Sequence, residues 1–161
     1  MKPGDHPEFF RFPAPAGRSR ESDIVLDAEG RFYHEGAPIE HAGMRRAFAS
    51  WIRRHPDDGR YILSNDYDWC YFTVDDAPCF VQGVLEGEGG IALELFDGRR
   101  EALDPRTLRL DDEGVLRARV RGGDLEARFL RQAQLEIGPW LEEDGDGFAL
   151  VLDGKRFPIQ A

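Results

Sequence analysis

The feature that most constrains the fold of this chain is a nine-residue pattern that occurs twice. Residues 24–32 read Ile-Val-Leu-Asp-Ala-Glu-Gly-Arg-Phe, and residues 108–116 read Leu-Arg-Leu-Asp-Asp-Glu-Gly-Val-Leu. Both copies follow apolar-x-Leu-Asp-x-Glu-Gly-x-apolar, with the two aspartates, Asp27 and Asp111, 84 residues apart. In each copy the pattern is followed by a hairpin, an amphipathic helix, an acidic Asp-Gly break and a closing hairpin. The matching order indicates an internal duplication.

The clearest predicted helix covers residues 42–54 of the first copy. Its apolar residues recur at i, i+3, i+4 and i+7 and form one stripe: Met44, Ala47, Phe48 and Trp51. Arg53 and Arg54 would then sit at the negative end of the helix dipole, and Pro56 would end the helix.

In the second copy, Gly122-Gly123 predicts a two-residue hairpin turn. The resulting register places Arg117 opposite Arg128 and Arg119 opposite Glu126. The other face of the hairpin is entirely apolar: Leu116, Ala118, Val120, Leu125, Ala127 and Phe129.

A second helix is predicted over 132–141, shortened or kinked at Gly138-Pro139. A closing hairpin around Asp153-Gly154 should pair Phe148 with Ile159 and Leu150 with Phe157.

These elements predict an α+β fold of two duplicated β-hairpin/helix/hairpin halves with mostly antiparallel sheet. Residues 1–22, with four prolines and no sustained period, are expected to form an extended or disordered arm. The first repeat is expected over 23–76 and the second over 107–161. Residues 77–106 are expected to be connecting strands that belong to the C-terminal half.

The formal net charge is −10 and the pI is near 4.9. An acidic chain argues against a nucleic-acid backbone or an anionic membrane as partner, because both attract a net basic face. No apolar run is long enough for a membrane helix, and the N-terminus lacks the apolar core of a signal peptide. We therefore expect a cytoplasmic protein with no nucleic-acid and no membrane partner.

Neither a metal site nor a cofactor site is predicted. Cys70 and Cys79 have no metal-ligand spacing and are too few for a disulfide framework, so we expect reduced structural thiols. The glycines of the 86–90 turn are not followed by the Lys-Ser/Thr of a phosphate loop. No serine or cysteine has a recognisable neighbouring base, so no catalytic residue is predicted.

Arg117 opposite Arg128 is the most informative pair for function. Like charges directly across a hairpin are destabilising unless an anion lies between them or a neighbouring strand supplies Asp or Glu. Arg131 is close in sequence, and guanidinium groups suit phosphate or carboxylate. Both explanations, an anion site and a structural ion pair, remain open at this stage.

Asp75 and Asp76 interrupt two β-rich runs just before Pro78, at the joint between the copies. Adjacent strand residues point to opposite faces, so the two carboxylates are not expected to share a proton. They are consistent with a turn whose carboxylates cap backbone N–H groups, or with a contact to a ligand or partner domain.

Several segments resemble one uncharacterised bacterial family, catalogued as domain of unknown function 1285, over residues 23–160. The resemblance implies a duplicated α/β core, a second half loosely similar to pleckstrin-homology folds, and a ligand cleft between the halves for a nucleotide-like molecule in signalling. No activity is established for the family. Two positions depart from its pattern, the stretch 64–69 and Cys79. The matching segments are Asp27 to Ile39, Gly59 to Leu63, Val74 to Pro78, Val120 to Arg128 and Phe157 to Ile159.

Taken together, we predict a ligand-binding or sensor module that takes a small anionic, nucleotide-like molecule between its halves. Arg117, Arg128 and Arg131 would hold the charge, and Asp75 and Asp76 would close the junction. The alternative is a protein–protein adaptor without a small ligand, in which the closing hairpins offer an edge to a protein partner or a second copy. An enzyme of unrecognised type ranks third.

Overall fold

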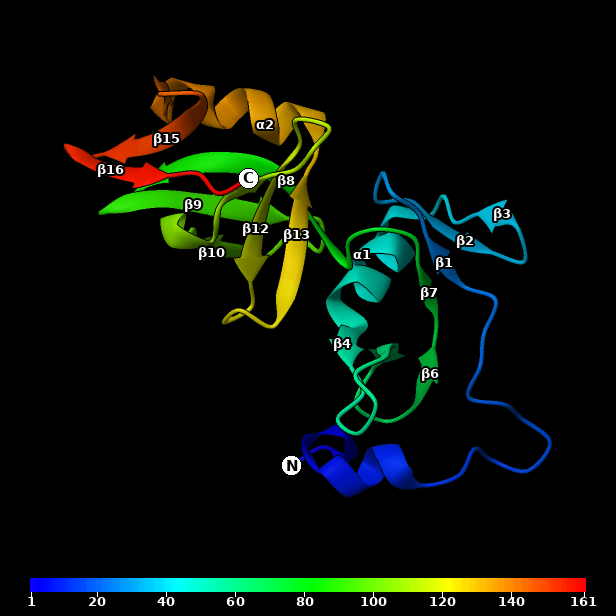
Figure 1. Cartoon of the computed structure of the whole chain (residues 1–161). Coiled ribbons are helices and arrows are strands. Elements are labelled where there is room, and N and C mark those ends of the chain that lie inside the picture. The colour runs from blue at the N-terminus through cyan, green and yellow to red at the C-terminus, as the bar shows by residue number, and fades with distance from the viewer. The chain divides into compact units, whose positions relative to one another are not determined.

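The computed structural model describes all residues from Met1 to Ala161 and shows an α+β protein with two α-helices and mostly antiparallel sheets. The chain divides into two compact units, Met1–Pro78 and Cys79–Ala161, whose elements are followed in Figure 1. Neither α-helix is long and apolar enough to cross a membrane.

The first unit contains two small sheets and one α-helix. The first sheet has the order β3-β2-β1-β7, and the second has the order β4-β5-β6. Helix α1 (Ala42–Trp51) lies between them in the chain and runs directly into β4 (Figure 1). The strands are β1 (Val25–Leu26), β2 (Phe32–His34), β3 (Ala37–Pro38), β4 (Ile52–Arg54), β5 (Tyr61–Ser64), β6 (Trp69–Tyr71) and β7 (Thr73–Val74).

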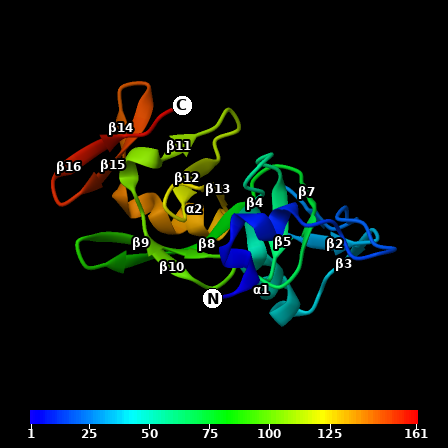
Figure 2. The same cartoon turned by 90° about the horizontal axis from the view of Figure 1, so that it is seen from below.

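The second unit has a six-stranded sheet of order β10-β9-β8-β13-β12-β11 and a three-stranded sheet of order β14-β15-β16. Helix α2 (Arg131–Ile137) lies against β8 and β13 of the larger sheet (Figure 2). The strands are β8 (Cys79–Gly87), β9 (Gly90–Leu95), β10 (Arg100–Ala102), β11 (Arg109–Leu110), β12 (Leu116–Val120), β13 (Leu125–Phe129), β14 (Leu141–Asp144), β15 (Gly147–Leu152) and β16 (Lys155–Pro158).

The duplication is visible in the backbone hydrogen bonds. In the first unit the chain returns to pair β7 parallel to β1, and Thr73 N donates to Ile24 O at 3.0 Å. In the second unit Gln160 returns in the same way, bridges parallel to Arg109, and its N–H donates to Leu108 O at 3.3 Å. Each unit therefore contains one copy of the same order of elements: hairpin, third strand, helix, three-stranded meander and parallel return.

The repeated aspartates make the same turn in both copies. Asp27 Oδ1 accepts hydrogen bonds from the backbone N–H groups of Glu29 and Arg31, each at 2.9 Å. Asp111 Oδ1 accepts from Glu113 and Val115, also at 2.9 Å. In each copy Oδ2 accepts from an arginine Nε at 3.1 Å. This is an Asx-type turn closed by an ion pair.

The second unit differs from the first by three added strands, β8 to β10. Strand β8 pairs parallel to β13, with Ala127 opposite Cys79 and Phe129 opposite Val81. In the first unit the corresponding strand, β3, lies at the edge of its sheet. There Ile39 N donates to Phe32 O at 2.9 Å, so the N–H group of Ile39 points toward β2.

The predicted hairpin around Gly122-Gly123 is confirmed. Arg117 lies opposite Arg128 and Arg119 opposite Glu126, as the alternation requires. The apolar face of this hairpin is buried. The closing hairpin also has the predicted register, with Leu150 opposite Phe157 and Ile159 N donating to Phe148 O at 2.9 Å. Helix α2 ends at Ile137, and a 3₁₀ turn follows over Gly138–Trp140, so Pro139 shortens it as expected.

The helix predicted over 42–54 is too long. It ends at Trp51, where Ile52 takes extended backbone angles and pairs with Leu63 in β4. Arg53 and Arg54 therefore lie on a strand, and not at the end of a helix dipole. Their guanidinium groups stack over the rings of Phe10 and Tyr61, at 4.5 and 4.6 Å from the ring centroids.

The expectation of an extended or disordered arm is wrong for residues 3–11, which form two 3₁₀ helices (Pro3–Asp5 and Pro7–Arg11). Phe10 is buried with Ile62 and Trp69. His55 Nδ1 accepts from Asp57 N at 3.1 Å, so its Nε2–H donates to Phe10 O at 2.9 Å. The arm is thus fixed by an aromatic cluster and a buried histidine.

Replacing Asp111 by Asn should destabilise the protein by about 1–3 kcal/mol, because a carboxylate accepting three hydrogen bonds loses its charge. Burial raises the pKa of the Asp111 carboxyl, but hydrogen bonds from Val115, Arg117 and Glu113 outweigh it, so its pKa lies below the ordinary value. A lowered folded-state pKa adds stability above the unfolded value that is lost as the pH falls. The difference between wild type and Asp111→Asn in urea unfolding should therefore shrink from about pH 5 to about pH 3.

The exposed neighbour Asp112 is the matched control. Asp112→Asn should leave stability nearly unchanged at both pH values. Equal effects of the two substitutions would contradict the structural role of Asp111.

Phe10→Ala should destabilise the first unit by about 2–4 kcal/mol, because a fully enclosed ring is removed from an aromatic cluster. Phe12, a residue that is 63% exposed, is the control, and Phe12→Ala should change stability by less than about 0.5 kcal/mol. Urea unfolding followed by tryptophan fluorescence measures both. If Phe10→Ala and Phe12→Ala both changed stability by less than about 0.5 kcal/mol, the arm would not contribute to stability.

Candidate functional site

Arg117 is held in the interior of the second unit by carboxylates of its own sheet. Its Nε donates to Asp111 Oδ2 at 3.1 Å, and its Nη1 donates to Glu126 Oε1 at 3.2 Å. Arg109 Nη2 donates to the same Glu126 oxygen at 2.8 Å. Only 10% of the Arg117 side chain is exposed. The turn before β12 and the facing strand β13 thus supply carboxylates next to the Arg117–Arg128 pair.

Arg128 and Arg131 line one cavity in the second unit, with a volume of about 280 Å³. Arg128 lies on β13 and is half-buried, whereas Arg131 is the exposed first residue of α2. Two arginine residues therefore line the same cavity. The other lining residues are Val115, Phe129, Gln134 and Leu135.

One wall of this cavity is fixed by Gln134. Its Oε1 accepts from Leu116 N at 3.0 Å, and its Nε2 donates to Gly114 O at 2.7 Å. Helix α2 is therefore attached to the repeated Asp-x-Glu-Gly turn. This makes the cavity a preformed feature of the second unit.

The remaining lining is mostly apolar. Phe129 is buried, Val115 is half-buried, and Leu135 is 65% exposed at the mouth. An apolar lining with two cationic groups suits a molecule that has both an anionic group and a short apolar part. The sequence did not predict that these residues line a cavity, because they come from three separate elements and no spacing connects them.

The structure does not bring all the predicted site residues into this cavity. Arg128 and Arg131 line it, and Arg117 does not. Asp75 and Asp76 belong to the first unit, where both are exposed. Asp75 N donates to Leu26 O at 2.9 Å, so the backbone of this stretch continues the pairing of β7 with β1.

Both thiols are weakly acidic. Burial raises the pKa of Cys79 to about 12, and burial also raises the pKa of the half-buried Cys70. No group of three or more His, Cys, Asp or Glu side chains is arranged to hold a metal ion.

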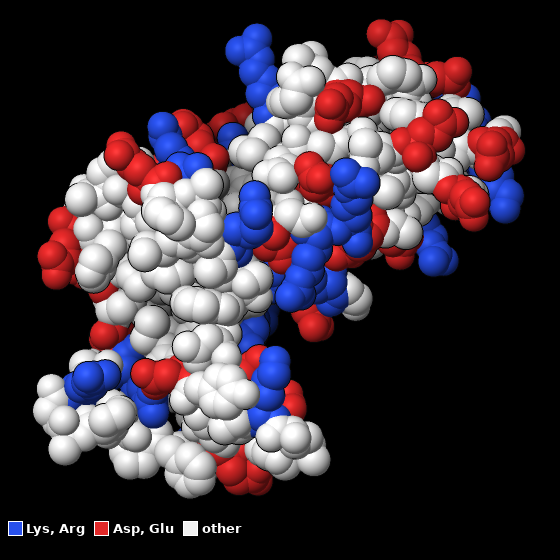
Figure 3. Space-filling view, turned by 180° about the vertical axis from the view of Figure 1, so that it is seen from behind, with Lys and Arg blue, Asp and Glu red and all other residues white.

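On one face of the molecule, acidic and basic side chains lie side by side. On the face shown in Figure 3, Lys and Arg side chains lie beside Asp and Glu side chains, and no broad patch of Lys and Arg alone covers either unit. Ion pairs of the second unit include Arg100 with Glu94 and Arg156 with Glu142, at 3.3 and 2.7 Å. With a net charge of −10, the chain has no overall basic field, so an anionic ligand would be attracted by particular arginines.

Arg117→Ala should destabilise the protein by about 2–4 kcal/mol, because it removes the buried cation that pairs with Asp111 and leaves Glu126 with Arg109. The control is Arg106→Ala, because Arg106 is an 82% exposed side chain paired only locally with Asp104. That change should cost less than about 1 kcal/mol. Chemical unfolding of both variants tests the structural role of Arg117, and equal stabilities would contradict it.

Two solved structures are similar to this chain. One is a DUF1285 family protein from Silicibacter pomeroyi DSS-3, with a TM-score of 0.68 and 22% identity over 94% of this chain and 92% of that chain. The other is a DUF1285 family protein from Shewanella baltica OS155, with a TM-score of 0.58 and 18% identity over 70% of this chain and 87% of that chain. No protein-family model and no curated protein sequence matches the chain. The chain therefore has the fold of DUF1285 family proteins, the family that its sequence motifs resemble.

Proposed function

We propose that this protein is a ligand-binding module that takes a small anionic molecule in the cavity between β13 and α2. The observation that carries the proposal is that Arg128 and Arg131 line the same preformed cavity. A single unit is sufficient for this site. Contributions of Asp75 and Asp76, a nucleotide-like ligand and a role in signalling stay predictions, as does the likeness of the second half to pleckstrin-homology folds.

The charge of the cavity supports an anionic ligand. Arginine presents planar N–H donors that match a carboxylate or phosphate group, and such charge-assisted hydrogen bonds are worth about 1.5–3 kcal/mol each. The chain is acidic overall, so two arginines at one cavity are a local departure from the net charge of −10. Selection of an anion would depend on these two groups.

The size and lining of the cavity support a small ligand with an apolar part. Its volume of about 280 Å³ is at the lower limit of ligand pockets, about 300–1,000 Å³. Phe129 and Val115 offer apolar surface next to the arginines. A phosphate or carboxylate on a single ring or short chain would use both kinds of surface.

The test is titration of the full chain with phenyl phosphate, benzoate, inorganic phosphate and AMP, followed by calorimetry and thermal unfolding. A ligand that binds the folded state raises stability with concentration, by about 2.7 kcal/mol at one hundred times its dissociation constant. Arg131→Gln should weaken binding of the best anion by about tenfold or more, because one charge-assisted hydrogen bond is lost. Arg106→Gln, which changes the same charge outside the cavity, should leave affinity unchanged.

The proposal is wrong if none of the four anions binds at millimolar concentration, or if Arg131→Gln and Arg106→Gln bind equally well. Arg117→Ala separates the structural role from the binding role. It should lower the free energy of unfolding and leave the affinity for the anion largely unchanged, because Arg117 does not line the cavity. Absence of anion binding would favour the adaptor function, for which the exposed Leu135 and Phe148 side chains of the second unit are the first residues to test.

A further inference from the structure

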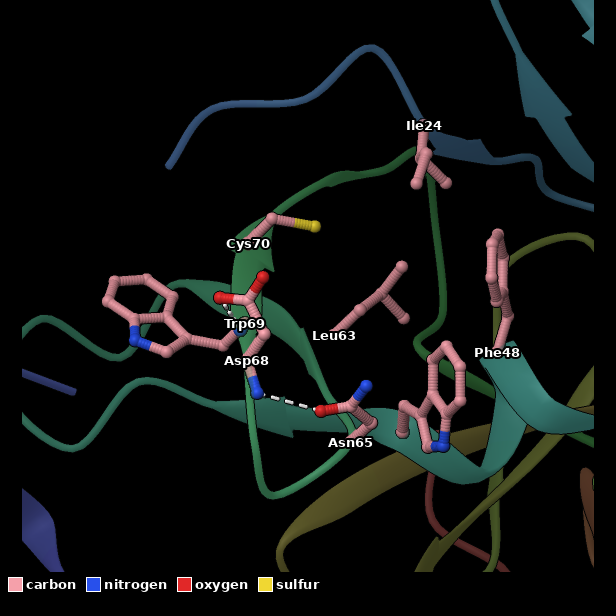
Figure 4. A pocket seen from close by; sticks show the side chains of 8 residues that line it. Ile24, Phe48, Leu63, Asn65, Asp68, Trp69 and Cys70 are labelled. Atoms are coloured by element: carbon pink, nitrogen blue, oxygen red, sulfur yellow. Dashed lines mark hydrogen bonds between the residues drawn. The ribbon is translucent and has the colours of Figure 1, made fainter. Parts of the chain in front are cut away.

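The first unit contains a separate hollow of about 190 Å³ that the anion site does not use. It is lined by residues of α1, of β5 and of the 65–68 turn, among others, and Figure 4 shows the side chains around it. The lining residues are Ile24, Phe48, Trp51, Leu63, Asn65, Asp68, Trp69 and Cys70.

Two aromatic rings from one helix form the apolar wall. Phe48 and Trp51 are neighbours on α1, with ring centroids 5.6 Å apart and planes inclined by 37°. Both are only half-buried, and the one fully buried residue of the helix is Ala49. Leu63 of β5 is buried at the base of the hollow. The aromatic stripe of α1 is thus incompletely covered within its own unit.

The polar end of the hollow has an amide whose orientation is fixed. Asn65 Oδ1 accepts hydrogen bonds from Tyr67 N at 2.9 Å and Asp68 N at 2.7 Å. Because both partners are N–H donors, the oxygen must face the turn, and the Nδ2 amide group must face the other way. In Figure 4 this nitrogen points toward the space beside Leu63.

The other polar group at this end is already engaged. Asp68 Oδ1 accepts from Arg20 Nη1 at 2.8 Å and from Trp69 N at 2.9 Å. The ion pair with Arg20 balances the Asp68 charge. The hollow therefore offers aromatic surface and an amide donor, and its carboxylate does not select a cation.

From this arrangement we infer that the first unit binds a planar aromatic molecule carrying a hydrogen-bond acceptor, such as an aryl ketone. The ring packs against Phe48 and Trp51, and the acceptor receives a hydrogen bond from Asn65 Nδ2. An apolar cavity of about 150 Å³ accommodates benzene, so this hollow has room for one substituted ring. The site is independent of the anion cavity because all its lining residues lie in the first unit.

Asn65→Asp is a conservative test of the amide. The substituted carboxylate still accepts the two backbone hydrogen bonds of the 65–68 turn, but it removes the donor that faces the hollow. Asn65 is the only asparagine of the chain, so selective ¹⁵N-asparagine labelling gives a single side-chain amide signal. Cys70 provides a second signal, since it lines the hollow and is half-buried, whereas Cys79 is 1% exposed.

The experiment compares acetophenone with ethylbenzene, which has the same ring without the acceptor, on the wild type and on Asn65→Asp. Acetophenone should shift the Asn65 amide signal, slow alkylation of Cys70 by iodoacetamide and bind about three- to tenfold more tightly than ethylbenzene. In Asn65→Asp that preference should disappear. Cyclohexyl methyl ketone, which keeps the acceptor but lacks the aromatic ring, should bind more weakly than acetophenone. Arg131→Gln should leave all these results unchanged, which separates this site from the anion site.

Two results would overturn the inference. The first is no shift of the Asn65 amide and no protection of Cys70 at millimolar acetophenone. The second is an equal preference for acetophenone in wild type and Asn65→Asp, which would show that Asn65 does not recognise the acceptor.

Discussion

Each unit depends on the parallel return of the chain to the first strand of its own hairpin. Backbone hydrogen bonds from Thr73 to Ile24 and from Gln160 to Leu108 join residues about fifty apart in sequence. Strands β1 and β11 are only two residues long, so each needs a neighbour on both sides to satisfy its backbone groups. Without this return, no strand pairing would join the meander of each copy to its hairpin.

The sequence predicted the features that local patterns determine. The hairpin at Gly122-Gly123 alternates strictly, and a shift by one residue would expose its apolar face, so its register was predicted correctly. The end of α1 was predicted wrongly. Residues Ile52 to Arg54 contain no helix breaker, and they form a strand only because they pair with β5. The arm was also missed, since the partners that bury Phe10 lie more than forty residues away.

Some features of the candidate site could likewise be predicted from the sequence, and others could not. Register alone predicted that Arg117 and Arg128 lie opposite each other. It did not predict which of many carboxylates would reach Arg117, and Asp111 does so because it already forms the turn of the repeated motif. The apolar lining around Arg128 and Arg131 comes from a turn, a strand and a helix, and no spacing rule connects them. The aromatic stripe of α1 was predicted from periodicity, but only the structure shows that it is left half-covered.

The edge strand β3 limits whether a further strand can be added to the first sheet. Ile39 N faces β2, so the nitrogen of Pro38, one residue earlier, faces away from the sheet. Proline has no N–H, and an incoming strand would find no donor there. In the second copy the equivalent edge, at β13, accepted β8 and the two strands that follow it. The missing donor at Pro38 therefore disfavours strand addition and edge-to-edge aggregation at the exposed edge of β3, whereas the equivalent edge of β13 is covered by β8.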